Sequence, residues 1–401
     1  MQRRTRSFGK SIHRAQPSRT HRRTSKTRRD KKEYSQTIHA SRFINKATSI
    51  KNTEVFTPVH TFTDFNFSEN LAKNIASKGY TAPTPIQDTI IPLILETQDV
   101  VGIANTGTGK TAAFLLPLIQ RVISNTREKV LIVVPTRELA IQIDEEFKSF
   151  VQGMRMFSAC CVGGASISKQ ISELRHYNSF VIGTPGRLKD LIQRKYIKLE
   201  TFNTIVLDEA DRMLDMGFIA DMRAIMQHMP VRRNTLFFSA TISPEIDALI
   251  KEFLTNPKIV SVKTRDTSAN IDQDVIRIEG KSKMELLQNL LKQKEFEKVL
   301  IFGRTKFGVE KLAKTLTERG FRSESIHGDK IHARRQRALT AFKEGRVRIL
   351  IATDVAARGL DIPNVSHVIN FDVPATYDDY IHRIGRTGRG DKTGKALTFI
   401  E

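Results

Sequence analysis

A lysine and a threonine follow two closely spaced glycines, and these residue types at this spacing could hold a phosphate group. The stretch runs from Gly107 to Thr111 and has the sequence GTGKT. Glycines let the backbone turn its N–H groups inward, the lysine can reach the β- and γ-phosphates of a nucleotide, and the threonine hydroxyl can bind Mg²⁺. Ala104 stands where the phosphate-loop pattern usually has its first glycine. A turn before an ordinary helix is the alternative interpretation.

An acidic pair could supply the other half of that chemistry. Asp208 and Glu209 come directly after the apolar run TIVL, which we expect to be a buried strand. Beside a phosphate loop, Asp208 could hold Mg²⁺, and Glu209 could orient and activate the attacking water. A strand that ends in a solvated acidic turn is the alternative.

The elements that must position these residues are visible as short apolar runs that alternate with helical patterns. The runs are VVGIA, KVLIVVP, FSACCVGG, SFVIGTP, TIVLDEA, NTLFFSAT and PKIVSV, and later DVIRIE, KVLIFGRT, FRSESIHG, RVRILIATD, HVINFD and KALTFI. Continuous apolar strands separated by helices favour parallel sheets covered on both faces. We therefore predict an α/β fold with two doubly wound domains, 61–262 and 273–401, joined by a polar linker at 263–272. Ligands should lie at the carboxyl ends of the strands.

Composition limits the class of protein. The 401 residues carry a net charge of +22, which favours a polyanionic partner, and no apolar run is long enough for a transmembrane helix. The two cysteines, Cys160 and Cys161, are adjacent within an apolar run. This placement predicts buried free thiols in a reducing compartment rather than a disulfide.

Basic residues are concentrated near the amino terminus. Residues 1–60 hold 16 Lys or Arg against 3 Asp or Glu and show little apolar periodicity. We expect a disordered tail that attracts nucleic acid through its phosphates. An organelle transit peptide and a nuclear address are the alternatives. A secretory signal is not expected, because no apolar core follows the first basic residues.

The tetrapeptide at 208–211, Asp-Glu-Ala-Asp, is the signature of the DEAD-box RNA helicases, and the chain resembles this group of helicase superfamily two from Phe62 to Glu401. About a dozen motifs match in the family's order. The resemblance implies two RecA-like domains, hydrolysis of ATP with Mg²⁺, and RNA bound through its backbone without reading of sequence. In the family, the chain usually continues into a closing helix after the last strand, whereas this sequence stops at Glu401.

The resemblance also assigns the nucleotide site. The stretch GYTAPTPIQ looks like the family's adenine-reading motif, in which Tyr80 would stack on the base and the Gln87 amide would read its edge. A core tyrosine and a helix-surface glutamine are the alternatives. The residues expected to bind nucleotide are Phe62, Tyr80, Gln87, Ala104, Asn105, Thr106, Gly107, Thr108, Gly109, Lys110, Thr111 and Asp361, with Thr111 and Asp208 on the metal.

Motifs in both halves resemble the family's RNA contacts. Most follow an apolar strand, where backbone N–H groups, hydroxyls and arginines can hold phosphates, although each is an ordinary strand-to-helix turn by itself. The candidates are Thr136, Arg137, Gly163, Gly164, Thr184, Arg187, Arg304, Gly328, Arg335 and Thr353. One position departs from the pattern, because His332 stands where the family commonly has glutamine.

Two further motifs would link hydrolysis to RNA binding. The hydroxyls of Ser239 and Thr241 could hydrogen-bond the 208–211 turn; a helix cap before PEIDALI is the alternative. Arg386 and Arg389 resemble arginine fingers that meet the γ-phosphate when the two lobes close, with a basic solvated surface as the alternative. The catalytic set is Lys110, Glu209, Arg386 and Arg389, and the coupling set is Asp211, Ser239, Thr241 and His382.

The sequence therefore predicts an ATP-dependent RNA helicase. We expect an RNA-dependent ATPase that unwinds short RNA duplexes or remodels RNA–protein complexes through ATP-driven closure of two lobes. It would act in the cytoplasm as a monomer, away from membranes, with RNP or ribosome-assembly factors as further partners. A DNA-directed helicase of the same superfamily and a non-catalytic RNA-binding protein are the alternatives.

Overall fold

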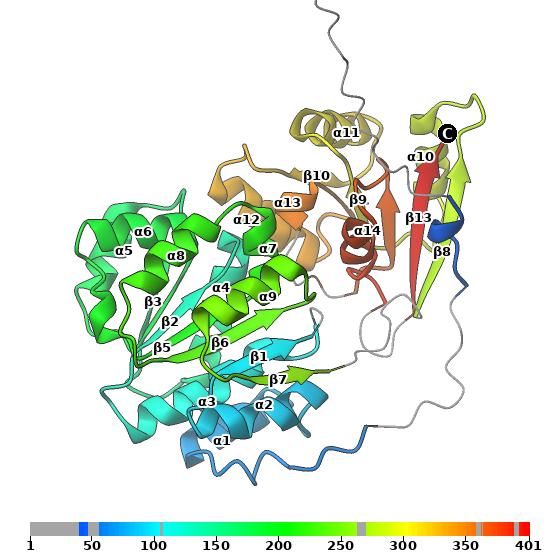
Figure 1. The fold of residues 1–401 in the computed structure, drawn as a ribbon. Coiled ribbons are helices and arrows are strands. Elements are labelled where there is room, and N and C mark those ends of the chain that lie inside the picture. Colours follow the sequence, from blue (N-terminus) through cyan, green and yellow to red (C-terminus); the bar gives the residue numbers. More distant parts are fainter. Residues whose placement is uncertain are drawn as a thin grey trace, which may run out of the picture. The chain divides into compact units, whose positions relative to one another are not determined.

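The computed structural model describes residues 40–46, 56–104, 107–262, 270–357, 362, 364–388 and 393–401, and only the backbone of His332 and Asp378. Two parallel sheets, each covered by helices on both faces, make up most of this part of the chain (Figure 1). The predicted α/β fold with two parallel-sheet domains is therefore confirmed. The predicted tail at 1–60 lies outside the described residues except for 40–46 and 56–60.

The first sheet has seven parallel strands in the order β3-β4-β2-β5-β6-β1-β7. Its strands are β1 (Val100–Ile103), β2 (Val130–Val133), β3 (Ser158–Cys161), β4 (Phe180–Gly183), β5 (Thr204–Leu207), β6 (Asn234–Ser239) and β7 (Lys258–Ser261). Each of the seven apolar runs predicted for this half is a strand. β2, β4, β5 and β6 are buried along their whole length, as expected when helices cover both faces of a sheet.

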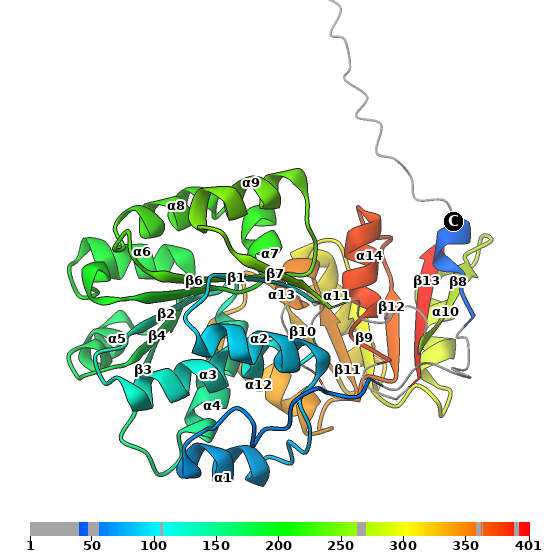
Figure 2. The same cartoon turned by 60° about the horizontal axis from the view of Figure 1, so that its bottom comes forward.

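Helices α1–α4 cover one face of this sheet and α5–α9 the other, and α2 packs along α3 (Figure 2). Polar caps and Pro at the first turn set several helix starts: Thr136 caps α4 and Ser243 caps α9. The helices are α1 (Glu69–Ser77), α2 (Pro85–Leu95), α3 (Lys110–Ser124), α4 (Arg137–Phe150), α5 (Ile167–Leu174), α6 (Pro185–Gln193), η2 (Leu199–Thr201), α7 (Ala210–Asp215), α8 (Ile219–Gln227) and α9 (Pro244–Phe253).

The second sheet has six parallel strands in the order β10-β11-β9-β12-β13-β8. Its elements are η1 (Ala40–Phe43), β8 (Ile271–Arg277), α10 (Lys283–Leu291), β9 (Val299–Phe302), α11 (Lys306–Glu318), β10 (Ser323–Ile326), α12 (His332–Lys343), β11 (Ile349–Ala352), α13 (Asp354–Ala357), β12 (His367–Asn370), α14 (Tyr377–Ile384) and β13 (Gly394–Ile400). Of the predicted linker at 263–272, residues 263–269 lie outside the described residues, and β8 begins at Ile271.

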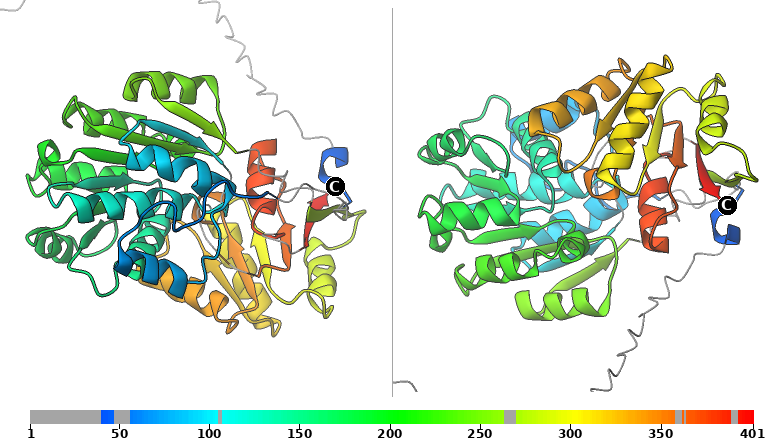
Figure 3. Two further views of the ribbon diagram at one scale, coloured as in Figure 1. Left: turned by 90° about the horizontal axis from the view of Figure 1, so that it is seen from below. Right: turned by 90° about the horizontal axis from the view of Figure 1, so that it is seen from above.

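The short helix η1 lies beside β8 (Figure 3), although it precedes the first sheet in sequence. Helices α10 and α11 cover one face of the second sheet, and α12, α13 and α14 cover the other. Within the described residues, no helix is long and apolar enough to cross a membrane.

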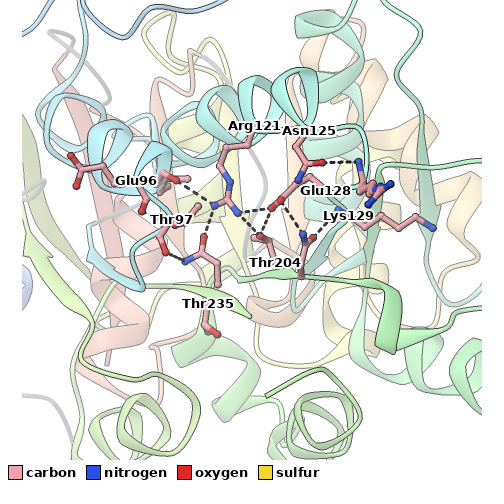
Figure 4. A network of polar contacts seen from close by, with 12 residues as sticks. Glu96, Thr97, Arg121, Asn125, Glu128, Lys129, Thr204 and Thr235 are labelled. Carbon is pink, nitrogen blue, oxygen red and sulfur yellow. Dashed lines mark hydrogen bonds and ion pairs between the residues drawn. The ribbon is translucent and has the colours of Figure 1, made fainter. Parts of the chain in front are cut away.

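A buried polar network closes the amino end of the first sheet (Figure 4). The Arg121 guanidinium donates to Glu128 Oε1 at 2.5 Å and to Asn234 Oδ1 at 2.6 Å. Glu128 Oε1 also accepts from the Thr204 hydroxyl at 2.7 Å. Burial lowers the pKa of Arg121, and the Glu128 carboxylate opposes this shift. The network ties the start of β5 and of β6 to α3.

The two cysteines are free thiols, as predicted. Cys161 is buried and Cys160 half-buried on β3. Burial raises the pKa of both thiols, that of Cys161 to about 12, so both stay protonated and unreactive near neutral pH.

Candidate active site

The glycine-bearing loop joins the carboxyl end of β1 to the start of α3, as predicted. Gly107 and Gly109 adopt left-handed backbone angles, with φ of 85° and 90°. A side chain at Gly109 would also meet Gln87, because its Cβ would lie 2.5 Å from Gln87 Nε2. Glycine is therefore required at this position for two independent reasons. Asn105 and Thr106 lie outside the described residues.

Helix α2 braces the loop from below. Gln87 Nε2 donates to the Gly109 carbonyl at 3.1 Å, and the Thr84 hydroxyl donates to the Thr108 carbonyl at 2.9 Å. Gln87 is fully buried, and its Oε1 accepts from the Thr84 backbone N–H at 3.0 Å. Gln87, the residue predicted to read adenine, is thus hydrogen-bonded to the loop predicted to hold phosphates. It does not lie on the helix surface.

Lys110 occupies the first position of α3 and is buried. Its ammonium has no hydrogen-bond partner among the residues that the structure describes. A buried charged donor without a partner is costly, and the start of a helix adds unpaired N–H groups and positive potential at the same place. The Lys110 ammonium and the N-terminus of α3 therefore form a site that would bind an anion. Thr111 follows, half-buried, on the same turn.

The acidic pair lies at the carboxyl end of β5. Asp208 is buried, and its Oδ1 accepts from the Glu209 N–H at 2.9 Å. Burial raises the pKa of Asp208 to about 6, and the positive charge of Lys110 works against this shift. A second cation close to Asp208 would lower this pKa further and favour the ionised carboxylate.

Glu209 has a left-handed backbone, with φ of 53°, which is unusual for a residue other than glycine. Its carboxylate forms a buried ion pair with Arg212, three residues later in the chain. Burial works to raise the pKa of Glu209, but three positive charges outweigh it and hold this pKa below its ordinary value. They belong to Arg212, Lys110 and Arg386. Glu209 is therefore ionised, as a residue that orients water must be.

A hydrogen-bonded link joins the acidic turn to the carboxyl end of β6. Asp211 Oδ2 accepts from the Ala240 N–H at 3.1 Å and from the Thr241 hydroxyl at 3.3 Å. The predicted bond from Thr241 to the acidic turn is thus confirmed. Ser239 instead donates to the Thr241 carbonyl at 2.7 Å. The alternative role as a helix cap falls to Ser243, which caps α9.

The predicted adenine aromatics pack against the rest of the first domain. Tyr80 makes edge contacts with Phe62 at 6.0 Å and Phe150 at 5.9 Å between ring centroids. Its hydroxyl donates to Glu146 at 3.3 Å, and burial raises its pKa. Tyr80 has the contacts of a core aromatic, the alternative considered from the sequence. Phe62 is half-buried beside it, and a role for either ring in stacking stays a prediction.

Two arginines predicted to bind RNA, Arg187 and Arg335, lie within electrostatic reach of a third, Arg137. The guanidinium of Arg137 lies against the turn formed by Gly163 and Gly164. Burial lowers the pKa of Arg137, and the positive charges of Arg335 and Arg187 add to the shift. Close like charges of this kind are stabilised when a polyanion lies across them.

Each of these arginines is positioned by neighbouring groups. Arg187 donates to Gln170 Oε1 at 2.8 Å, and Gln170 in turn donates to the Val162 carbonyl at 2.9 Å. Arg335 of the second domain lies 2.7 Å from Glu138 Oε1 of the first. Thr136 and Thr184 are the residues that precede α4 and α6. Arginine side chains and helix N-termini thus lie together near the carboxyl ends of the strands.

The second domain carries the remaining candidates. Arg304 is exposed and is positioned by a bond from its N–H to Asp372 Oδ2 at 2.8 Å. Thr353 is buried before α13, and its carbonyl accepts from the Ala357 N–H at 2.9 Å. Gly328 lies beside the Lys306 side chain, 3.8 Å from where a Cβ would lie.

Arg386 follows α14, is buried, and donates from Nε to the His382 carbonyl at 3.3 Å. Its charge contributes to the lowered pKa of Glu209, so these two predicted catalytic residues come within electrostatic range. Asp361 and Arg389 lie outside the described residues. The backbone of His332 opens α12.

Two residues that shape the site, Arg212 and Arg383, received no role from the sequence. Arg212 pairs with Glu209, and its spacing of three residues on a helix was the available signal. Arg383 donates to Asp354 at 2.5 and 2.8 Å, which ties α14 to α13. Within the described residues, no group of three or more His, Cys, Asp or Glu could hold a metal unaided.

Comparison with known proteins gives a consistent result. The family model for the DEAD/DEAH box helicase matches residues 84–249, and that for the helicase conserved C-terminal domain matches residues 282–391. The chain is 46% identical to the DEAD-box ATP-dependent RNA helicase CshA of Geobacillus kaustophilus, over 85% of this chain and 73% of the relative. It is 47% identical to CshA of Bacillus subtilis, over 85% of this chain and 69% of the relative.

Solved structures are similar over the same region. Saccharomyces cerevisiae Dbp5 bound to RNA and ADP BeF3 is 30% identical with a TM-score of 0.75, over 85% of this chain and 89% of that one. The DEAD-box helicase Mss116 bound to single-stranded RNA and UDP-BeF is 30% identical with a TM-score of 0.78, over 86% of this chain and 76% of that one.

Proposed function

Because the chain belongs to the DEAD/DEAH box helicase family, we propose that it is an RNA-dependent ATPase that unwinds short RNA duplexes or remodels RNA–protein complexes. The observation that carries this proposal is the Lys110 ammonium, which is buried at the start of α3 without a hydrogen-bond partner among the described residues. A triphosphate supplies the missing partner. ATP is the substrate, and hydrolysis gives ADP and phosphate.

Nucleotide binding uses the phosphate loop and α2. The loop N–H groups and Lys110 hold the phosphates, while Gln87 senses them through its bond to the Gly109 carbonyl. Tyr80 and the upstream Phe62 offer rings to the base, and Gln87 offers an amide. The roles of Asn105, Thr106 and Asp361 rest on the family resemblance alone.

Thr111 and Asp208 would hold Mg²⁺, which neutralises charge on the phosphate oxygens when bound. The residues present fit this ion. Asp208 is buried at the end of β5, with a pKa raised to about 6 by burial, and a cation beside it would offset that cost. The Thr111 hydroxyl lies one residue after Lys110 and is half-buried.

Glu209 orients the attacking water through its ionised carboxylate, while Arg212 fixes the position of that carboxylate. Arg386 stabilises the charge that develops on the γ-phosphoryl oxygens, with Arg389 as its partner from the same motif. Lys110 and Glu209 belong to the first domain and Arg386 to the second. Full activity therefore requires that the two domains close on the nucleotide.

RNA binds through its backbone across both domains. Arg137, Arg187 and Arg335 form the core of this surface, since the charges of Arg187 and Arg335 both act on Arg137. Thr136, Gly163, Gly164 and Thr184 add polar and backbone contacts in the first domain, and Arg304, Gly328 and Thr353 do so in the second. ATP and RNA both favour the closed arrangement, so each strengthens binding of the other. Thr241, through its bond to Asp211, couples domain closure to the catalytic turn. Ser239 and His382 belong to the same coupling set.

We further propose that the protein acts as a monomer in the cytoplasm, with RNP or ribosome-assembly factors as partners. The two protonated free thiols support a reducing compartment. The domains extend over residues 61–262 and 273–401 with a linker at 263–272, except that Ile271 and Asp272 belong to β8. The basic residues 1–60 would add salt-sensitive affinity for RNA.

The test is phosphate release by the full-length protein with single-stranded RNA. Glu209→Gln should reduce the stimulated rate by about 10² or more, because it removes the carboxylate that orients the water. The matched control is Glu252→Gln, which makes the same change in a surface ion pair with Arg223 and should change the rate by less than about twofold. Turnover that ignores RNA, or that DNA stimulates equally, would contradict the proposal.

A further inference from the structure

A short segment of the predicted tail is packed onto the second domain. Phe43 is only 1% exposed and lies in one apolar cluster with Ile271 of β8, Tyr380 and Ile384 of α14, and Ala396 of β13. Its ring centroid lies 4.8 Å from that of Tyr380. Residues 40–46 therefore pack on the second domain, although they precede the first domain in sequence.

Backbone and charged contacts fix the same segment. The Asn45 N–H donates to the Gln273 carbonyl at 3.0 Å, and the Gln273 N–H donates to the Asn45 carbonyl at 2.7 Å. This antiparallel bridge adds a partner to β8, the edge strand of the second sheet. The Arg42 guanidinium lies 4.1 Å from the Tyr377 ring centroid. Lys46 lies 3.6 Å from Asp272, so both ends of the segment are held.

The helix that this segment contacts carries the arginine motif. Tyr377, Tyr380 and Ile384 lie at helical spacing on one side of α14, and Tyr380 also donates its hydroxyl to Gln273 Oε1 at 2.9 Å. On the same helix, Arg383 donates to Asp354 at 2.5 and 2.8 Å. Arg386 comes two residues after the end of α14 and bonds back to the His382 carbonyl at 3.3 Å. Any tilt of α14 would therefore displace Arg386.

We propose that residues 40–46 are an integral part of the second domain and that Phe43 is a positioning residue for Arg386. The Phe43 ring fills the space between α14 and the β8–β13 edge, and it holds the helix at the angle that brings Arg386 to the γ-phosphate. This inference rests on the role of Arg386 in the proposed function. It separates residues 40–46 from the rest of the basic stretch, whose expected contribution is RNA affinity.

The experiment measures kcat and KM for ATP at saturating single-stranded RNA, in the full-length protein. Phe43→Ala should lower kcat by about tenfold and leave the KM for ATP within about twofold, because the phosphate loop and α2 lie in the first domain. Phe43→Leu, which keeps most of the apolar contact, should recover most of the rate. Ile44→Ala is the matched control, since Ile44 is the next residue and is 47% exposed.

A second variant tests the segment through its backbone. Asn45→Pro removes the N–H that donates to Gln273, and it should lower kcat in the same direction as Phe43→Ala. Equal kcat for wild type, Phe43→Ala and Asn45→Pro would overturn the proposal, as would a loss confined to RNA affinity. If Glu209→Gln abolishes turnover while Phe43→Ala does not lower kcat, the positioning role fails and the proposed function stands. If Glu209→Gln retains turnover, the proposed function itself fails.

Discussion

The two ends of the first sheet both bury charged side chains, but only one end completes their hydrogen bonds with the chain itself. At the amino end, Arg121 bonds Glu128, Asn234 and the Thr204 hydroxyl. At the carboxyl end, Lys110 is buried, and its ammonium lacks a hydrogen-bond partner among the described residues. Two cations of α3, the half-buried Arg121 and the buried Lys110, thus have opposite surroundings near the two ends of the helix.

The difference separates a structural role from a binding role. A buried ion pair with complete hydrogen bonds fixes the relative position of α3, β5 and β6 and leaves nothing for a ligand. A buried ammonium without a hydrogen-bond partner lowers stability, and such a group persists where a ligand supplies the missing contact. The carboxyl end also holds the left-handed Glu209 and the two left-handed loop glycines, so backbone strain and unmet polarity occur together there.

The largest effect on stability is expected at the amino end. Arg121→Met should lower the free energy of unfolding of the first domain by about 3 kcal/mol, because it leaves the buried Glu128 carboxylate without its cation. Urea unfolding followed by circular dichroism suits this chain, which has no tryptophan. The change should leave kcat at low temperature unaltered.

The control for this prediction is Arg223→Met, which breaks an exposed pair with Glu252 and should cost less than about 1 kcal/mol. If Arg121→Met were as harmless as the control, or if it abolished ATP hydrolysis in a folded protein, the assignment of a purely structural role to the amino end would be wrong.

A smaller effect sharpens the comparison in the second domain. His367 begins β12, is buried, and stacks on Phe296 with ring centroids 4.0 Å apart. Burial lowers its pKa to about 4, so the unfolded chain binds a proton more readily than the folded one between that pH and about 6.5. Stability from this group is therefore complete above pH 6.5 and is lost as the pH falls towards 4. From pH 7 to 5.5 the loss should be roughly 1 kcal/mol.

Unfolding of wild type and His367→Asn at the two pH values checks this prediction. The variant should lose about 1 kcal/mol less stability on acidification than wild type, whereas His228→Asn, at an exposed histidine, should behave as wild type. An identical pH dependence in wild type and His367→Asn would show that the buried imidazole is not the group responsible.

Local sequence patterns predicted the strands of both sheets, the phosphate loop and the acidic turn. Every apolar run predicted as a strand is a strand. For β2, β4, β5 and β6 the reason is burial on both faces, which requires a strand to be apolar along its length. The phosphate loop and the acidic turn each follow an apolar run directly, so each was predicted at the carboxyl end of a strand. Contacts between distant segments could not be predicted in this way. Gln87 lies on the loop at Gly109, and Arg335 meets Glu138 across two domains, through spacings that no periodic pattern encodes.

The packed part of the predicted tail shows the same limit. Phe43 is one aromatic residue in a basic stretch, with no neighbouring periodicity to indicate a buried face. Its burial depends on a space between α14 and β8 that forms only when the second domain has folded. Composition describes the average behaviour of such a segment, and a single side chain can depart from that average.

Binding of a non-hydrolysable ATP analogue with Mg²⁺ tests most directly whether the buried Lys110 ammonium, which lacks a hydrogen-bond partner among the described residues, marks the nucleotide site. Thermal unfolding is measured for wild type, Lys110→Met and Lys251→Met, the last being an exposed lysine on α9. At about 100 times Kd, the analogue should stabilise wild type and Lys251→Met by about 2.7 kcal/mol. Lys110→Met should gain little stability from the analogue, because it lacks the ammonium that binds the phosphates. Equal stabilisation of Lys110→Met would contradict the account.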